Sequence, residues 1–383
     1  MQRAFCIVLA AALASALSSA AENATAFDAG TAAATQNEAR PTEVPASTRS
    51  WRDLLADGKR AYEHGEFARA LENLTPALAG VEREPGANSK DLIEVLDRFG
   101  MTQRELGRYK DAEATFRREL ALNDTAHGKK SIAYAENLLD LGHTLSDADE
   151  YERSAPLTEQ ANAILRALPK VPDSTRSWAL HELASVRYNQ NRDREAEALW
   201  QQTLTIRLRI YGEKSTRTAT TLFNLATLAS NDPARKAEAL RLFDRALAGY
   251  EADAPEQADV GLTLLRIADI KRENNAGYSV LAPLYRRVIA IYERAYGPEH
   301  KNLAVPLDDL ADALETGKQY KEAIALRLRL LALIERHGET YGDAVLQHDS
   351  LAEDYAAVGD DAQAKRHEDL GAELCKKTAS CDD

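Results

Sequence analysis

Two short strings in this chain contain residue types that carry out chemistry in enzymes. His181 and Glu182 begin the helical zinc-protease pattern, in which two histidines bind the metal, but Ser185 stands where the second histidine belongs. Residues 128–131 are similar to the end of a phosphate-binding loop, but Asn123 replaces its first glycine. Both patterns are incomplete. We therefore expect no enzymatic activity, no catalytic residue, no metal site and no cofactor.

Two cysteines near the C-terminus form a third chemically active group. Cys375 and Cys381 are separated by five residues. In an oxidising compartment, thiols this close form a small-loop disulfide, which would tie the tail to the last helix. The alternatives are a redox-active pair, a two-ligand metal site, and free or intermolecular thiols. The first two lack a Cys-x-x-Cys spacing and nearby histidines, so a structural disulfide is the expectation.

The N-terminus has the composition of a targeting segment. Arg3 is the only charge in residues 1–21, and a mostly apolar run is followed by small residues. This pattern predicts a signal peptide over 1–21, with an uncleaved anchor as the alternative. Residues 22–49 are rich in Ala, Thr, Asn, Glu and Pro, which predicts a disordered spacer. We expect secretion across the inner membrane to the periplasm; an intracellular location would require the signal peptide to be false.

The remaining composition restricts the partners. The formal net charge is −13, whereas nucleic acids and anionic lipids select basic surfaces. No second apolar run is long enough to cross a membrane. We therefore expect neither nucleic-acid binding nor a membrane span after signal cleavage.

An apolar residue followed by a small one recurs through the chain every 42 residues, with one interval of 43 and one of 41. The copies are Asp57-Gly58 (a degenerate first copy), Phe99-Gly100, Leu141-Gly142, Leu183-Ala184, Leu225-Ala226, Ile267-Ala268, Leu310-Ala311 and Leu351-Ala352. About twelve residues later comes a second small or apolar residue, usually followed after four residues by a bulky one: Leu74, Phe116, Trp200, Phe243 or Tyr285. Apolar residues between these positions have helical spacing. Two features in one register predict a repeat protein.

This pattern resembles the tetratricopeptide repeat, and its longer period resembles the 42-residue repeats of kinesin light chains and their bacterial relatives. An aromatic residue in the turn, such as Tyr109 or Tyr320, belongs to the resemblance. Glu119, Thr203 and Gly371 depart from it by replacing the usual second-helix alanine. The resemblance implies an all-α, right-handed superhelical solenoid of about eight helix pairs over residues 50–374, followed by a tail at 375–383.

In this family the first helix of each pair lines a concave groove that binds protein or peptide segments. The family's groove positions correspond here to Trp178, His181, Ser185, Tyr188, Asn189, Thr220, Phe223, Asn224, Thr227 and Arg266. Aromatic rings would stack on partner side chains, and amides would bond the partner's backbone. For Trp178 and Tyr188, packing between adjacent helix pairs is the alternative role.

The same positions in the last two pairs are acidic. They are Asp308, Asp309, Asp312, Glu315, Asp349 and Glu353. If these acids face the groove, the C-terminal half should prefer a partner with a basic segment. The alternative is a solvated face on an acidic protein.

The sequence thus predicts a non-enzymatic scaffold or adaptor that binds a protein or peptide partner. One alternative is a structural subunit of an envelope complex that uses convex or terminal faces, which an apolar patch outside the groove would favour. Another is an enzyme or its regulatory subunit, which would require histidines and acids to converge on one groove pocket.

Overall fold

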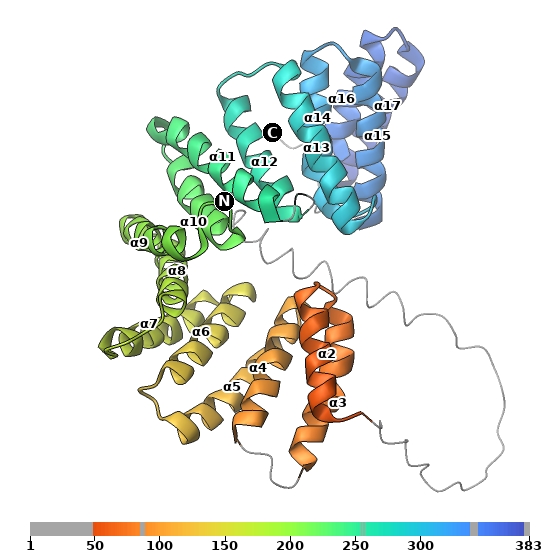
Figure 1. Ribbon diagram of the computed structural model, residues 1–383. Coiled ribbons are helices and arrows are strands. Elements are labelled where there is room, and N and C mark those ends of the chain that lie inside the picture. The colour runs from red at the N-terminus through yellow and green to blue at the C-terminus, as the bar shows by residue number, and fades with distance from the viewer. Residues whose placement is uncertain (1–48, 85–88, 254, 256, 338–343, 379–383) are drawn as a thin grey trace, which may run out of the picture. The chain divides into compact units, whose positions relative to one another are not determined.

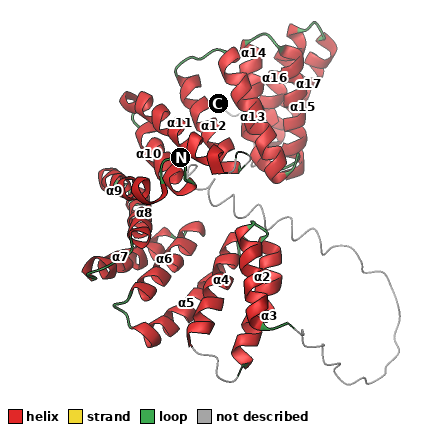
Figure 2. Ribbon diagram, in the orientation of Figure 1, coloured by secondary structure: helices red, strands yellow, loops and turns green. Residues whose placement is uncertain are grey.

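The computed structural model describes residues 49–84, 89–253, 255, 257–337 and 344–378 (Figure 1). The predicted signal peptide and nearly all of the predicted spacer lie outside these residues. The described residues form α-helices and two short 3-10 helices, without a β-strand (Figure 2). The predicted all-α class is confirmed.

The helices form the eight predicted pairs. The pairs are α2 (Trp51–Glu63) with α3 (Phe67–Arg83), α4 (Ser89–Glu105) with α5 (Tyr109–His127), α6 (Ile132–Asp147) with α7 (Tyr151–Ala167), α8 (Asp173–Asn189) with α9 (Asp193–Tyr211), α10 (Thr216–Ser230) with α11 (Lys236–Asp253), α12 (Ala258–Glu273) with α13 (Tyr278–Tyr296), α14 (Ala304–Thr316) with α15 (Tyr320–His337), and α16 (Ala344–Ala357) with α17 (Asp361–Thr378). The chain divides into two compact units, one up to Thr203 and one from Leu204 onward.

The small second residue of the repeated dyad allows the two helices of a pair to approach closely. A Cβ added to Gly100 would lie 2.8 Å from the ring of Phe116, and one added to Gly58 would lie 2.6 Å from Leu74 Cγ. Both distances are shorter than a normal contact, so a larger residue would force the facing side chain of the second helix to shift. Phe116 and Leu74 occupy the predicted bulky position, which we call the bulky slot, and both are fully buried.

The turns inside the pairs repeat one backbone feature. A residue with positive φ follows the first helix at Gly65, Gly107, Asp149, Asn191, Asn275, Lys318 and Gly359. This left-handed conformation favours glycine, and asparagine and aspartate tolerate it better than other side chains. The connection between α10 and α11 differs, because Asp232 caps a 3-10 helix, η1 (Pro233–Arg235), by accepting a hydrogen bond from the Ala234 amide.

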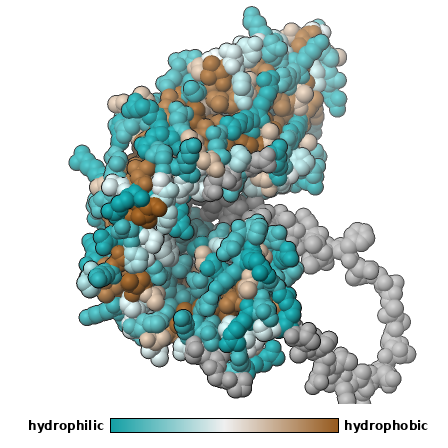
Figure 3. Space-filling model, in the orientation of Figure 1, coloured by the Kyte–Doolittle hydropathy of each residue, from teal (hydrophilic) through white to brown (hydrophobic). Residues whose placement is uncertain are grey.

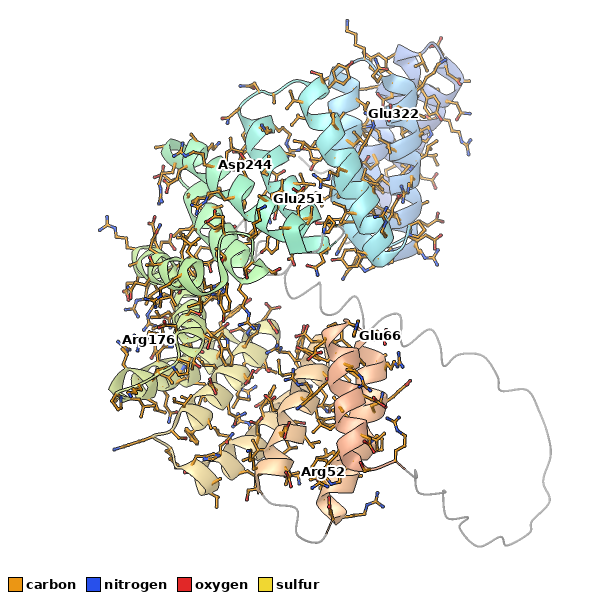
Figure 4. All side chains as sticks on the ribbon, in the orientation of Figure 1. Arg52, Glu66, Arg176, Asp244, Glu251 and Glu322 are labelled. Carbon is orange, nitrogen blue, oxygen red and sulfur yellow. The ribbon has the colours of Figure 1, made fainter. Side chains whose placement is uncertain are left out.

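Neighbouring pairs within each unit share apolar cores and ion pairs. In the first unit, Trp51, Leu74 and Val95 join α2, α3 and α4 in one cluster. In the second unit, second helices of successive pairs are bridged by Arg287–Glu251 and Arg286–Glu322, whose acids are labelled in Figure 4. Within each unit, neighbouring pairs are thus joined as in a solenoid.

The C-terminal helix extends past the predicted end of the repeats. Helix α17 ends at Thr378, whereas the sequence predicted the boundary at 374. Cys375 therefore lies on the helix, where it is disulfide-bonded. Its predicted partner, Cys381, lies outside the described residues. Over the described ranges, none of the helices combines the length and the apolar character needed to span a membrane.

Candidate binding surface

The predicted binding residues of the first unit lie on α8 and are held by neighbouring side chains. Trp178 is half-buried, and its Nε1 donates a hydrogen bond to Glu182 Oε1 at 3.2 Å. The Tyr188 ring lies 5.7 Å from the ring of Trp200, centroid to centroid. Trp178 also packs against the apolar cluster of α6 and α7, which is packing between adjacent pairs, whereas the Tyr188 contact lies within its own pair. The other predicted residues on α8 are His181, which is buried, and Ser185 and Asn189, which are half-buried.

The predicted binding residues of the second unit lie on α10 and α12. Phe223 makes an edge contact with Phe243, at 5.3 Å between ring centroids. Thr220 accepts a hydrogen bond from the Tyr250 hydroxyl at 3.2 Å. Asn224 is half-buried, Thr227 donates to the Phe223 carbonyl at 2.9 Å, and Arg266 lies 3.6 Å from Asp269. These contacts fix the side chains in place.

The six acids of the predicted patch do not all lie together in the structure. Asp309 is buried and pairs with Arg272 of α12. On α16, Glu353 is exposed, and Asp349 lies against α17, because a Cβ on Gly371 would meet its carboxylate at 2.9 Å. Only Asp308, Asp312 and Glu315 converge, and they do so around a residue that the sequence analysis did not select.

That residue is Arg327 of α15, which is 2% exposed. Its Nη2 donates to Asp312 Oδ1 at 2.9 Å and to Glu315 Oε2 at 2.7 Å. Its Nε donates to Asp354 Oδ2 at 3.1 Å, and its Nη1 lies 3.7 Å from Asp308 Oδ1. Gln347 links the group further by donating to Asp308 Oδ1 at 2.8 Å. We call these six residues the Arg327 cluster.

The electrostatics of the Arg327 cluster are dominated by burial and by an excess of acid. Burial raises the pKa of Asp354 to about 6, against the lowering effect of Arg327. Burial also raises the pKa of Asp308. For Arg327, burial opposes the charged form, but the carboxylates led by Asp312 more than compensate and raise its pKa. Four carboxylates share one guanidinium, so the cluster keeps negative charge when they are ionised.

The repeat register contains a signal for this cluster. Arg327 follows Ala323 by four residues, so it occupies the bulky slot that Phe243 and Tyr285 fill in the two preceding pairs. A cation buried in an apolar slot is stable only if oppositely charged side chains lie next to it. The slot could have been found from the sequence, whereas its partners come from α14 and α16 and required the structure.

The first unit contains a different polar network on α4, α6 and α8. Buried Arg104 donates to Glu105 at 3.0 Å and lies 3.8 Å from Asp140. His143 lies 3.5 Å from Asp147 and 3.3 Å from Glu182. Burial opposes protonation of His143, but these two acids raise its pKa to about 9. Cations and anions alternate along this network, which the sequence analysis also missed.

Glu119, one of the departures from the repeat pattern, is buried beside this network. Burial raises its pKa to about 9, with Asp97 and Asp140 adding to the effect, so it is protonated at neutral pH. Asn123 donates to its Oε1 at 3.2 Å. Within the residues that the structure describes, no three histidine, cysteine or acidic side chains are grouped to hold a metal ion.

The eight helix pairs define an all-α helical-repeat protein. Residues 175–252 match the tetratricopeptide repeat family, whereas no curated protein sequence matches the chain. The matched residues, from α8 to α11, thus have the sequence pattern of tetratricopeptide repeats.

Several solved structures have a similar fold. The apo form of RapI has a TM-score of 0.54 at 12% identity, covering 86% of this chain and 99% of its own. A Rap protein complexed with competence and sporulation factor has a TM-score of 0.52 at 14% identity, covering 86% and 98%. A signal-transduction ATPase with a tetratricopeptide repeat sensor, from Pyrococcus horikoshii, has 0.53 at 14% identity, covering 81% of this chain and 47% of its own. These identities show a shared fold and nothing about activity.

Proposed function

We propose that the chain is a non-enzymatic scaffold that binds a protein or peptide segment along the first helices of its pairs. The observation that carries the proposal is the set of carboxylates on α14, which remain partly exposed while Arg327 holds them in fixed positions. Fixed, partly exposed polar groups lower the entropy lost on binding.

The fold supports a binding role by analogy. The Rap protein of similar fold was solved in complex with competence and sporulation factor. Polar residues cover most of the face shown in Figure 3, with apolar residues in small groups among them. A mixed surface of this kind suits recognition of an extended segment through a few anchoring side chains.

The charge of the second unit favours a partner with a basic segment. Asp308, Asp312 and Glu315 lie close together on α14, and Arg327 neutralises only part of their charge. Complementary charge would speed association and exclude acidic competitors.

We also propose that the chain acts in the periplasm. The signal-peptide pattern of residues 1–21 supports this location, and so does the disulfide-bonded state of Cys375, since such bonds persist in oxidising compartments. Fractionation followed by mass spectrometry tests the location. A processed N-terminus near Glu22 in the periplasmic fraction is expected, and an unprocessed chain in the cytoplasm would contradict it.

A pull-down from envelope extract tests the binding proposal. The full chain is compared with the variant Trp178→Ala/Tyr188→Ala/Asn224→Ala and with Arg176→Ala, an exposed position on α8 labelled in Figure 4. Thermal unfolding shows whether loss of the Tyr188–Trp200 contact changes stability. A partner retained by Arg176→Ala and lost by the folded triple variant supports binding on the first helices. If both the triple variant and Arg176→Ala retain the partner, the interface lies on another part of the surface. If the full chain captures no partner at all, the scaffold proposal is contradicted.

A further inference from the structure

Arg327 departs from the apolar packing that most other repeats show in the bulky slot, where the remaining exceptions are Thr158 and Glu368. Phe116, Phe243 and Tyr285 fill the bulky slot with rings that are fully buried. Arg327 is buried to nearly the same extent but must be surrounded by four carboxylates. A buried ion cluster generally stabilises a fold no better than apolar packing does. A fully buried arginine in this mostly apolar slot is therefore a candidate functional position.

The cluster has fewer hydrogen-bond donors than its carboxylates can accept. The Asp354 side chain is fully buried and turned toward Arg327, yet its Oδ1 has no hydrogen-bond partner. Asp309, next to Asp308 in sequence, is 8% exposed and has an unpartnered Oδ2. Unpaired buried acceptors are rare in folded proteins because they cost free energy. Since one guanidinium serves four carboxylates, the exposed acids of the cluster can accept hydrogen bonds from an additional positively charged donor.

The carboxylates open to solvent on one stripe of α14. The side chains of Asp308, Asp312 and Glu315 are 43%, 55% and 35% exposed, respectively. Val305 precedes them at helical spacing and is 44% exposed. Leu346 occupies the same repeat position on α16 and is 61% exposed. Acidic and apolar contact points are therefore available together on these first helices.

We propose that the Arg327 cluster, with Val305 and Leu346, is a subsite for an Arg or Lys side chain that lies near an apolar residue in an extended partner segment. Asp308, Asp312 and Glu315 contact the cation, and Arg327 is a positioning residue that holds them. This inference rests on the proposed function and narrows it to one kind of partner sequence.

The helix geometry sets the spacing in the partner. Val305 and Asp312 are seven residues apart, which corresponds to about 10 Å along the helix axis at about 1.5 Å per residue. An extended segment covers this distance in about three residues. The expected partner sequence thus has an apolar residue and a basic residue separated by roughly two positions.

Acids on the second helices provide a matched control. Glu251 and Glu322 are also partly exposed, but each faces its own arginine, Arg287 or Arg286 (Figure 4). Their charge is balanced pairwise, so they lack the acid excess of the Arg327 cluster. Removing two negative charges there changes the net charge equally and leaves the subsite intact.

A random dodecamer peptide library displayed on phage tests the subsite with the purified full chain. Parallel selections use Asp312→Asn/Glu315→Gln, the control Glu251→Gln/Glu322→Gln, and Val305→Ser/Leu346→Ser. The last variant alters only exposed apolar residues, so it tests the apolar contact even if the first variant is destabilised. Enriched peptides are then synthesised with Arg or Lys replaced by Gln, and their affinities are measured by fluorescence anisotropy.

The expected result is enrichment of peptides with the apolar-and-basic spacing on the full chain and on the control. Affinity should fall about tenfold for Asp312→Asn/Glu315→Gln and for the Gln-substituted peptides. Peptides without a basic residue, equal binding to the acid variant, or equal loss on the control would overturn the subsite and leave the scaffold proposal standing. Failure of the full chain to enrich any peptide would contradict both proposals.

Discussion

Two consecutive helix pairs of the second unit solve the same packing problem in different ways. In α12/α13 the bulky slot holds Tyr285, whereas in α14/α15 it holds Arg327, and both side chains are fully buried. Tyr285 fills the slot chiefly by packing, while Arg327 requires carboxylates from α14 and α16. The comparison shows that the register determines where a side chain is buried, but not which kind of interaction satisfies it.

The largest effect is expected from removing the charge of Arg327 alone. Arg327→Met leaves four carboxylates without their guanidinium, which should lower the free energy of unfolding by about 3–5 kcal/mol. Arg329→Met is the control two residues away, where the partly exposed pair with Glu293 contributes about 0–1 kcal/mol. Urea unfolding followed by circular dichroism measures both. Equal losses in the two variants would show that Arg327 is not the essential counter-charge.

Replacing the cluster by apolar packing should have a smaller effect of opposite sign. Arg327→Phe/Asp354→Leu restores the ring found in the two preceding pairs and removes the fully buried acid. The free energy of unfolding should stay the same or rise by about 1–4 kcal/mol. The same variant should bind basic peptides more weakly, because Asp312 and Glu315 lose their common anchor. A strongly destabilised variant would indicate that the cluster is needed for the fold itself.

A third substitution tests the small residue of the first helix that faces the bulky slot of α4/α5. Gly100→Ala introduces a Cβ within 2.8 Å of Phe116, so the ring must shift, at a cost of about 1–3 kcal/mol. Gly277→Ala is the matched control, since its Cβ would meet no atom within 4 Å. Thermal unfolding of the two variants gives the difference. A neutral Gly100→Ala would mean that the helices of this pair can separate without loss.

The smallest effect should be a dependence of stability on pH. Asp354 has its pKa raised from 3.8 to about 6 by burial, so between these values the folded chain holds a proton that the unfolded chain has lost. The free energy of unfolding should therefore fall as the pH rises through this window. Asp354→Asn should remove this contribution, which unfolding at several pH values can detect. An unchanged slope would argue against the raised pKa.

The fold was largely predictable because it depends on short-range patterns. The repeated dyad predicted about eight pairs, and the described residues form eight. The 3-10 helix at Pro233–Arg235 was not predicted, because a local cap at Asp232 decides it.

The candidate binding surface was only partly predictable. The register placed Asp308, Asp312 and Glu315 on one helix face, but it could not show that Asp349 turns toward α17. Arg327 and Asp354 were missed because their pairing joins residues 27 positions apart on different helices. The Arg104 network in the first unit was missed for the same reason, since Asp140 contacts it from the next pair.

The turns within the pairs bear on how the gene could gain or lose repeats. Seven of the eight contain a single left-handed residue at the same place, whether glycine, asparagine, aspartate or lysine. Each of these seven hairpins therefore closes by its own local geometry and does not depend on a distant partner. A duplication or deletion of one 42-residue segment of the gene would therefore leave the remaining turns of this kind unchanged.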